Sequence, residues 1–176
     1  MSFQLQLDLI LLLVVVTAAI IDLAIRKIPN KLLLAAVCAV LGLHMIDPTQ
    51  GSLSSALGGA AIGFALFVPL YAVGGMAAGD VKLMATVGLF LGPSDALYAC
   101  ILTWCVGGGM ALVIILFTRR WSAAYHNLRN LLLPIVLGLG PPVPGAAPAR
   151  ASVGSMPYGL AIALSTLWLL IQRHHP

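Results

Sequence analysis

The sequence predicts an all-α, polytopic membrane protein that folds as a single domain, residues 1–176, built as a bundle of about six transmembrane helices. Three observations support this fold class. Hydrophobic residues make up 61% of the 176 residues, charged residues make up only 8%, and apolar runs recur along most of the chain. A soluble domain usually carries about 25% charged residues, whereas a lipid-facing surface needs none. The composition therefore excludes an ordinary soluble domain.

Six apolar runs are the candidate helices. A helix that crosses a bilayer needs about 20 residues. The run that begins at Lys31 and the run that begins at Val81 are shorter than this length. We expect neighbouring helices to shelter part of the Val81 run. In chain order the runs are Leu7–Ile25, Lys31–Ile46, Leu53–Gly74, Val81–Gly92, Ala96–Thr118 and Met156–Ile171.

Turn-forming residues separate these runs. Pro29 ends the first helix, and Asn30 can cap the second. Asp47–Gly51 is a polar turn, and Gly74–Gly79 is a flexible link made of small residues. Residues 119–155 form the one long loop, which is rich in proline in its second half. Most of the six apolar runs are therefore joined by tight connections.

The basic residues predict the orientation of the chain in the membrane. Cytoplasmic loops carry an excess of Lys and Arg. If the loop after the first helix is cytoplasmic, eight of the nine basic residues lie on that side, and the 119–155 loop lies there too. Both termini are then outside. The eight are Arg26, Lys27, Lys31, Lys82, Arg119, Arg120, Arg129 and Arg150. We interpret these charges as topology signals, so we expect no nucleic-acid partner.

Two aspartates, Asp22 and Asp80, are predicted to lie at the same depth. Asp22 is near the cytoplasmic end of the first helix, and Asp80 is at the cytoplasmic start of the fourth. Carboxylates within membrane segments are costly and are usually functional or paired. Two neighbouring carboxylates repel each other's charge and can share one proton. Such a pair supplies a base that activates water and an acid that protonates a peptide carbonyl.

Plainer roles for each aspartate remain open at this point. Asp22 and Arg26 are four residues apart and can form a simple ion pair on one helix. Asp80 follows Gly79 and can be an ordinary helix N-cap. Two separate structural roles do not explain why both carboxylates fall at one depth. The coincidence favours a shared catalytic function.

The remaining polar residues predict no metal or cofactor. The four histidines do not cluster with each other or with the two aspartates, and the spacing of the three cysteines is unlike that of metal ligands. Asp8, near the outer end of the first helix, is expected to be a solvated interface residue. The cysteines are Cys38, Cys100 and Cys105, and the histidines are His44, His126, His174 and His175.

Three segments resemble the type IV prepilin peptidases, which are aspartic proteases of the membrane. Asp22-Leu-Ala-Ile-Arg-Lys-Ile-Pro-Asn30 resembles the first aspartate motif of that family. Gly74-Gly-Met-Ala-Ala-Gly-Asp-Val-Lys-Leu-Met84 resembles the second motif, which contains the GxGD signature of aspartic intramembrane proteases. Met156-Pro-Tyr-Gly-Leu-Ala-Ile162 resembles the Pro-Tyr-Gly segment that begins the last helix of the family. The three segments occur in the family's order and span nearly the whole chain.

The resemblance implies a leader peptidase of the bacterial inner membrane whose substrate is a prepilin or pseudopilin held in the lipid bilayer. Asp22 and Asp80 match the catalytic pair, at the cytoplasmic face. The motif residues near them are implied to contact substrate: Gly75, Ala77, Gly79, Lys82, Pro157, Tyr158 and Gly159. Ala77 replaces the first glycine of GxGD, and its methyl group can alter substrate fit. The chain lacks the cysteine-bearing insertion of the bifunctional members, so it resembles the short, peptidase-only form of tight-adherence (Flp-type) pili.

Three other functions fit part of this pattern. A related GxGD protease could cut another leader peptide, such as an archaellin-type leader. A proton-coupled transporter component could use Asp22 and Asp80 as a relay, but a relay needs ionisable groups at several depths, including the midplane. A structural assembly subunit would tolerate Asn at either position. The two carboxylates at one face favour proteolysis.

Overall fold

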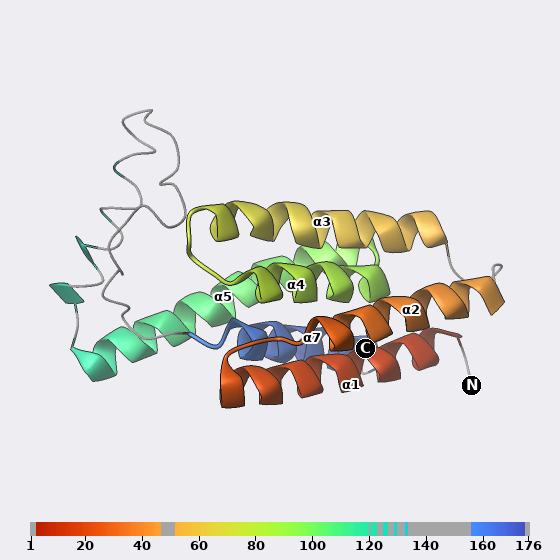
Figure 1. Ribbon diagram of the computed structural model, residues 1–176, viewed down its shortest axis with the longest axis horizontal. Coiled ribbons are helices and arrows are strands. Elements are labelled where there is room, and N and C mark those ends of the chain that lie inside the picture. The colour runs from red at the N-terminus through yellow and green to blue at the C-terminus, as the bar shows by residue number, and fades with distance from the viewer. Residues whose placement is uncertain are drawn as a thin grey trace.

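The computed structural model is an all-α bundle, which confirms the predicted fold class. The structure describes residues 3–46, 52–119, 121–122, 125–126, 129, 133 and 156–174. Within these residues there are six long helices and no strand, and the helices lie side by side (Figure 1). The helices are α1 (Phe3–Ile25), α2 (Asn30–Ile46), α3 (Leu53–Ala72), α4 (Ala78–Leu91), α5 (Pro93–Thr118) and α7 (Tyr158–His174). The predicted turn at 47–51 and most of the 119–155 loop lie outside the described residues.

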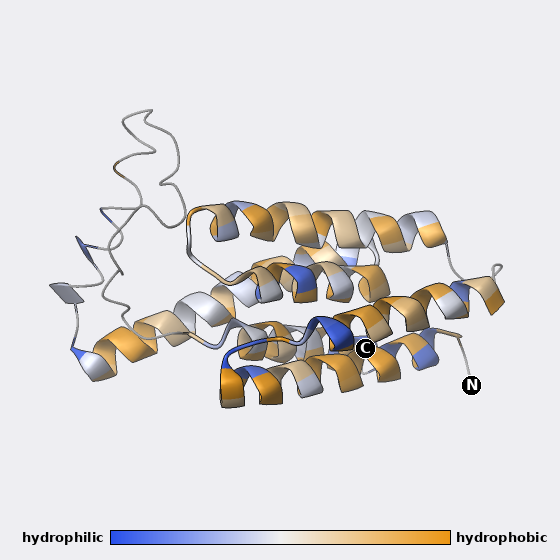
Figure 2. Cartoon of the chain, viewed as in Figure 1, coloured by the Kyte–Doolittle hydropathy of each residue, from blue (hydrophilic) through white to orange (hydrophobic). Residues whose placement is uncertain are grey.

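The helix surfaces are those of a membrane protein. Three helices, α1, α3 and α5, are long and apolar enough to cross a membrane, and α2 is a shorter apolar helix. Large apolar side chains are exposed on their outer faces; Leu13, for example, is 68% exposed. Figure 2 shows mostly hydrophobic helices and a hydrophilic connection between α1 and α2. Lipid is the surrounding in which such apolar faces are stable.

Helix α4 is the centre of the bundle. It packs against α1, α2, α3, α5 and α7, and 10 of its 14 residues are buried. This confirms that neighbouring helices shelter the short fourth run. The helix begins at Ala78, three residues before the predicted start, because Ala77 has an extended backbone and acts as the N-cap. It ends at Leu91, and the C-cap Gly92 has a φ of +79°, which favours glycine and turns the chain directly into α5.

Helices α3 and α4 approach so closely that their backbones touch. A Cβ atom added to Gly59 would lie 2.1 Å from the carbonyl oxygen of Gly88, and one added to Gly88 would lie 2.2 Å from that of Gly59. One turn away, a Cβ on Gly63 would lie 2.6 Å from the oxygen of Met84. Small residues allow this approach within a membrane. The contact fixes the position of α4 against the long helix α3.

Glycines also end α3. The N–H of Gly75 donates to the carbonyl of Leu70 at 2.8 Å, and the N–H of Gly74 donates to that of Tyr71 at 2.9 Å. Gly74 has a φ of +76°. This is the Schellman pattern that satisfies the last carbonyls of a helix. Helix α3 therefore ends at Ala72, two residues before the predicted end, and the Gly74–Gly79 segment begins as an ordered cap.

At the end of the bundle where α1 begins and α7 ends, called here the Arg173 end, a group of charges ties helices together. The guanidinium of Arg173 donates to Asp8 Oδ1 at 3.0 Å, to Asp95 Oδ2, and to the carbonyl of Leu91 at 3.2 Å. His174 Nε2 lies 3.2 Å from Asp8 Oδ2. The prediction that Asp8 is a solvated interface residue was wrong, because its side chain is only 5% exposed.

Replacing Arg173 by Met should destabilise the bundle by about 2 kcal/mol. Breaking a buried ion pair costs roughly 3–5 kcal/mol because one charge is left without a partner. The loss is smaller here because the Arg173 side chain is 23% exposed and His174 remains near Asp8. Reversible unfolding in mixed micelles measures the change. Adding Asp8→Asn to this variant removes the stranded charge and should restore part of the stability. An unchanged single variant would contradict this role of Arg173.

Candidate active site

Asp22 lies on the last turns of α1 and its carboxylate is held by another helix. The backbone N–H of Gly159, at the start of α7, donates to Asp22 Oδ2 at 2.9 Å. The Asp22 side chain is buried, with 6% exposure. Arg26, one turn further along α1, attracts the carboxylate electrostatically. The attraction between Asp22 and Arg26, left open by the sequence as a simple ion pair, is therefore one part of a larger arrangement.

Gly159 fits this position because it has no side chain. A Cβ atom added there would lie 2.9 Å from both Cβ and Oδ2 of Asp22. The local backbone leaves the Gly159 N–H available, because the N–H groups on either side donate to Met156 and Pro157. The first N–H groups of a helix have no partner within the helix. Pro157 and Tyr158 thus start α7 so that the N–H of Gly159 points at Asp22.

Asp80 lies in the first turn of α4. Its Oδ2 atom accepts a hydrogen bond of 3.0 Å from the backbone N–H of Ala77, and the side chain is 6% exposed. A carboxylate at this position stabilises a helix start. Asp80 is therefore not the N-cap, which is Ala77, but the third residue of the helix, where it supports the helix start. Support of the helix start does not explain why a second negative charge acts on Asp80 from another helix.

That charge belongs to Asp22. The carboxylates of Asp22 and Asp80 are close enough to repel each other, and the charge of Asp80 also acts on the hydroxyl of Tyr158. The three groups come from α1, α4 and α7, which pack against one another. We call this part of the bundle the Asp22 end. The structure thus brings together two buried carboxylates and one phenol from three helices.

At the Asp22 end, the connection between α1 and α2 contacts the start of α4. Lys82 Nζ donates to Asn30 Oδ1 at 3.1 Å, which links α4 to the start of α2. Gly79 packs against Ile28, since an added Cβ would lie 3.4 Å from the Ile28 Cβ. The segment that follows Asp22 therefore contacts the segment around Asp80. These contacts tie the start of α4 to the connection between α1 and α2.

The predicted site residues do not all contribute in the same way. Tyr158 and Gly159 lie with the two aspartates, and Ala77 contacts Asp80 through its N–H. Gly75 instead caps α3 through its bond to Leu70.

Sequence reasoning missed two further neighbours of these residues. Ile28 packs against Gly79, and Gly107 of α5 lies under the Tyr158 ring, where an added Cβ would be 3.2 Å from Cε1. The sequence signal that could have found Gly107 is a glycine within an apolar helix.

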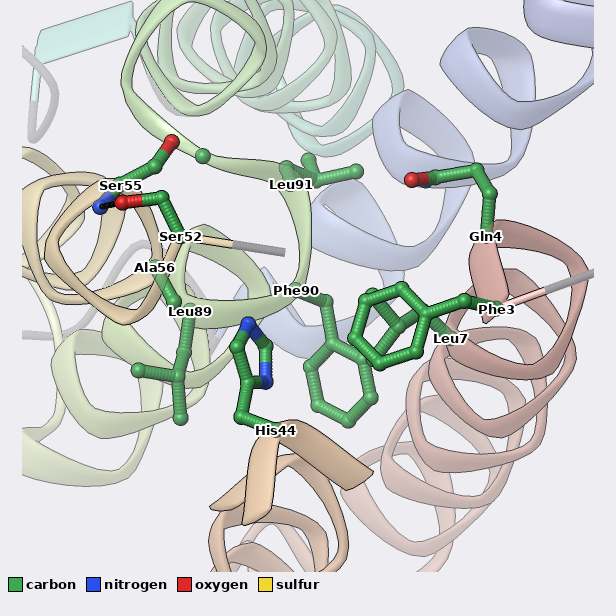
Figure 3. A pocket seen from close by; sticks show the side chains of 11 residues that line it. Phe3, Gln4, Leu7, His44, Ser52, Ser55, Ala56, Leu89, Phe90 and Leu91 are labelled. Atoms are coloured by element: carbon green, nitrogen blue, oxygen red, sulfur yellow. Dashed lines mark hydrogen bonds between the residues drawn. The ribbon is translucent and has the colours of Figure 1, made fainter. Parts of the chain in front are cut away.

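A pocket of about 110 Å³ (Figure 3) is lined by residues from the start of α1, the end of α2, the start of α3 and the end of α4, so it lies at the opposite end of the bundle from Asp22 and Asp80. Its polar residues are Gln4, His44, Ser52 and Ser55. The Nδ1–H of His44 donates to the carbonyl of Val40, 2.9 Å away. Among the described residues, no group of three His, Cys, Asp or Glu side chains could hold a metal ion. The Arg173 end also brings two carboxylates together, but there Asp8 and Asp95 both bond to a cation, Arg173, whereas Asp22 and Asp80 bond to backbone N–H groups.

Comparison with known proteins gives one finding. A family model described as the type IV leader peptidase family matches residues 9–112. The matched region contains Asp22 and Asp80 and ends before α7. Neither a curated protein nor a solved structure matches the chain.

Proposed function

This chain belongs to the type IV leader peptidase family, and from this premise we propose that it is an aspartic endopeptidase that removes the basic leader peptide from type IV prepilins or pseudopilins. One observation carries the proposal. Asp22 and Asp80 are buried carboxylates on different helices, and the charge of Asp22 acts on Asp80. Membership of a peptidase family and a carboxylate pair together favour hydrolysis of a peptide bond.

The proposed chemistry needs only the two carboxyl groups and a water molecule. The ionised carboxylate takes a proton from water while the water oxygen attacks the scissile carbonyl carbon. The protonated carboxyl gives its proton to the carbonyl oxygen. Collapse of the tetrahedral intermediate breaks the C–N bond, and the leaving amine takes up a proton. The products are a leader with a new carboxylate and a pilin with a new N-terminus.

We place the Asp22 end at the cytoplasmic face of the bacterial inner membrane, with both chain termini outside. The support is the excess of Lys and Arg in the connections at this end, including Arg26, Lys27 and Lys31. A prepilin suits this arrangement, because its basic leader lies in the cytoplasm and its hydrophobic helix lies in the bilayer. The scissile bond between them would meet the site at the membrane surface.

Several residues at the Asp22 end are proposed to contact the substrate. Ala77 and Gly79 precede Asp80 and offer little side-chain bulk to an extended peptide. Lys82 is held by Asn30, so we assign it to the rim of the site. Tyr158 is near Asp80 and can donate a hydrogen bond to the substrate backbone. Peptidase activity alone is proposed, without methylation of the new N-terminus.

Co-expression with a prepilin in bacterial membranes tests this proposal. We expect the pilin to become shorter by its leader, because the bond before the hydrophobic helix is cut at the cytoplasmic face. In inside-out vesicles the cytoplasmic face points outward. A pilin whose basic leader carries a charged, membrane-impermeant label on that face should lose the label. A pilin that keeps its full length in the presence of folded enzyme would count against the proposal, and so would cleavage on the outer side.

A further inference from the structure

The two aspartates have different surroundings. Asp22 accepts an N–H bond from the start of a second helix, α7, and is attracted by Arg26. Asp80 also accepts one N–H bond, from Ala77, at its own helix start, where the dipole of α4 favours a negative charge as well, but the charge that acts on it is that of Asp22 rather than that of a cation. Both carboxylates cannot easily carry a negative charge when they repel each other. The charge should stay on the carboxylate that has more positive partners.

We propose that the N-terminus of α7 holds Asp22 in its ionised form, so that Asp22 is the general base and Asp80 carries the proton as the general acid. Gly159 is the positioning residue for this arrangement. The assignment rests on the two-aspartate peptidase proposed above. It adds which carboxylate does which step and gives α7, which lies beyond the matched family region, a direct role in the reaction.

The geometry of Gly159 supports a positioning role. Its N–H reaches Asp22 from a residue 137 positions away in the chain, and the dipole of α7 places partial positive charge at the same point. Asp22 itself lies near the C-terminus of α1, where the dipole of its own helix disfavours a negative charge. The start of α7 therefore offsets an unfavourable local position. There is no space for a Cβ at Gly159, so the contact depends on this residue type.

The other ionisable groups around the pair fit the same assignment. Arg26 on α1 adds positive charge near Asp22. Tyr158 on α7 lies near Asp80, and a neutral phenol is compatible with a protonated carboxyl. Lys82 on α4 points to Asn30 and is exposed. In the proton balance, Asp22 gains the proton of the attacking water as Asp80 gives its own to the carbonyl oxygen. Asp22 then passes its proton to the leaving amine as the C–N bond breaks, and Asp80 takes back a proton from a hydroxyl of the intermediate as the carbonyl reforms. The new carboxyl group loses its own proton to solvent.

Two changes at Gly159 test the proposal in the purified, reconstituted full chain with a prepilin as substrate. Gly159→Ala adds a methyl group that must push Asp22 away from the N–H. Replacing Gly159 by glycolic acid turns the amide into an ester and removes the N–H without adding bulk. Gly42→Ala is the matched control, because an added Cβ meets nothing within 4 Å there. The measured quantities are kcat and KM between acid and alkaline pH.

We expect both Gly159 changes to lower kcat, by about 100-fold for Ala, and to leave KM within roughly threefold. The ester should move the acid limb of the kcat/KM profile to higher pH by about one unit, because the ionised base has lost a hydrogen bond. The Gly42→Ala control should match the wild-type chain. If Gly159→Ala does not fold, the ester variant decides the question.

Other outcomes would overturn the proposal. A raised KM with unchanged kcat would make Gly159 a substrate contact. An ester variant with the wild-type rate and pH profile would show that the N–H does not hold the base. The peptidase proposal fails separately, when the wild-type chain leaves the prepilin intact. A third result separates the two proposals: the wild-type chain cuts, loss of either aspartate stops cleavage, and the ester variant behaves as wild type. In that case only the assigned role of α7 is wrong.

Discussion

Replacing either Asp22 or Asp80 by Asn is expected to abolish cleavage while leaving the bundle folded. Asn has the same shape as Asp, and its carbonyl oxygen can still accept the bonds from Gly159 or Ala77. It cannot take a proton from water or deliver one to a carbonyl. General acid–base catalysis contributes roughly 10²–10⁴-fold per group, so we expect each variant to lose about a thousandfold in rate, the middle of that range.

The control for this experiment is Asp95→Asn at the Arg173 end. Asp95 is 36% exposed and bonds to Arg173 rather than to the other carboxylates. Its loss should leave cleavage near the wild-type rate. Initial rates on a prepilin in membranes, at matched amounts of folded enzyme, give the comparison. Rapid cleavage by Asp22→Asn or by Asp80→Asn would assign that residue a structural role, as an ion-pair partner or a helix cap.

The second large effect is expected at the contact of α3 with α4. Gly88→Ala would bring a methyl carbon to 2.2 Å from the carbonyl oxygen of Gly59, so the two backbones must separate. Overpacking usually costs 1–3 kcal/mol, and a clash with backbone belongs at or above the upper end, about 3 kcal/mol. Since α4 carries Asp80, the separation should also lower the cleavage rate of molecules that remain folded.

Unfolding in mixed micelles and the cleavage rate are the two measurements for Gly88→Ala. Gly108→Ala makes the same chemical change on α5, where an added Cβ meets nothing within 4 Å. It should be neutral or slightly stabilising, because Ala is the better helix former. Equal stability of these two variants would show that the close approach of α3 and α4 is not required for the fold.

Much of the fold could be predicted from the sequence because the membrane imposes a simple pattern. Apolar runs near the length of a bilayer gave six helices in the right order, and the structure has all six in its described residues. Helix ends were less accurate. Helix α3 stops at Ala72 because Gly74 takes a positive φ, and α4 begins at Ala78 because Ala77 is extended. Both features are backbone geometries that apolar runs do not reveal.

The candidate site was predictable in its residues but not in its contacts. The motif resemblance and the shared depth of Asp22 and Asp80 selected the two carboxylates. The bond from Gly159 to Asp22 joins residues far apart in the chain, and so do the bonds of Lys82 to Asn30 and Arg173 to Asp8. Local sequence patterns carry no information on such partners. The same reason explains why Asp8 was wrongly predicted to be solvated.

The most direct test of the central claim is cleavage of a prepilin by the purified chain in liposomes, with both products identified by mass spectrometry. The account predicts one cut, just before the hydrophobic helix of the pilin, and the loss of this cut in the Asp22→Asn and Asp80→Asn variants. An intact prepilin, under conditions in which another leader peptidase cuts the same substrate, would contradict it.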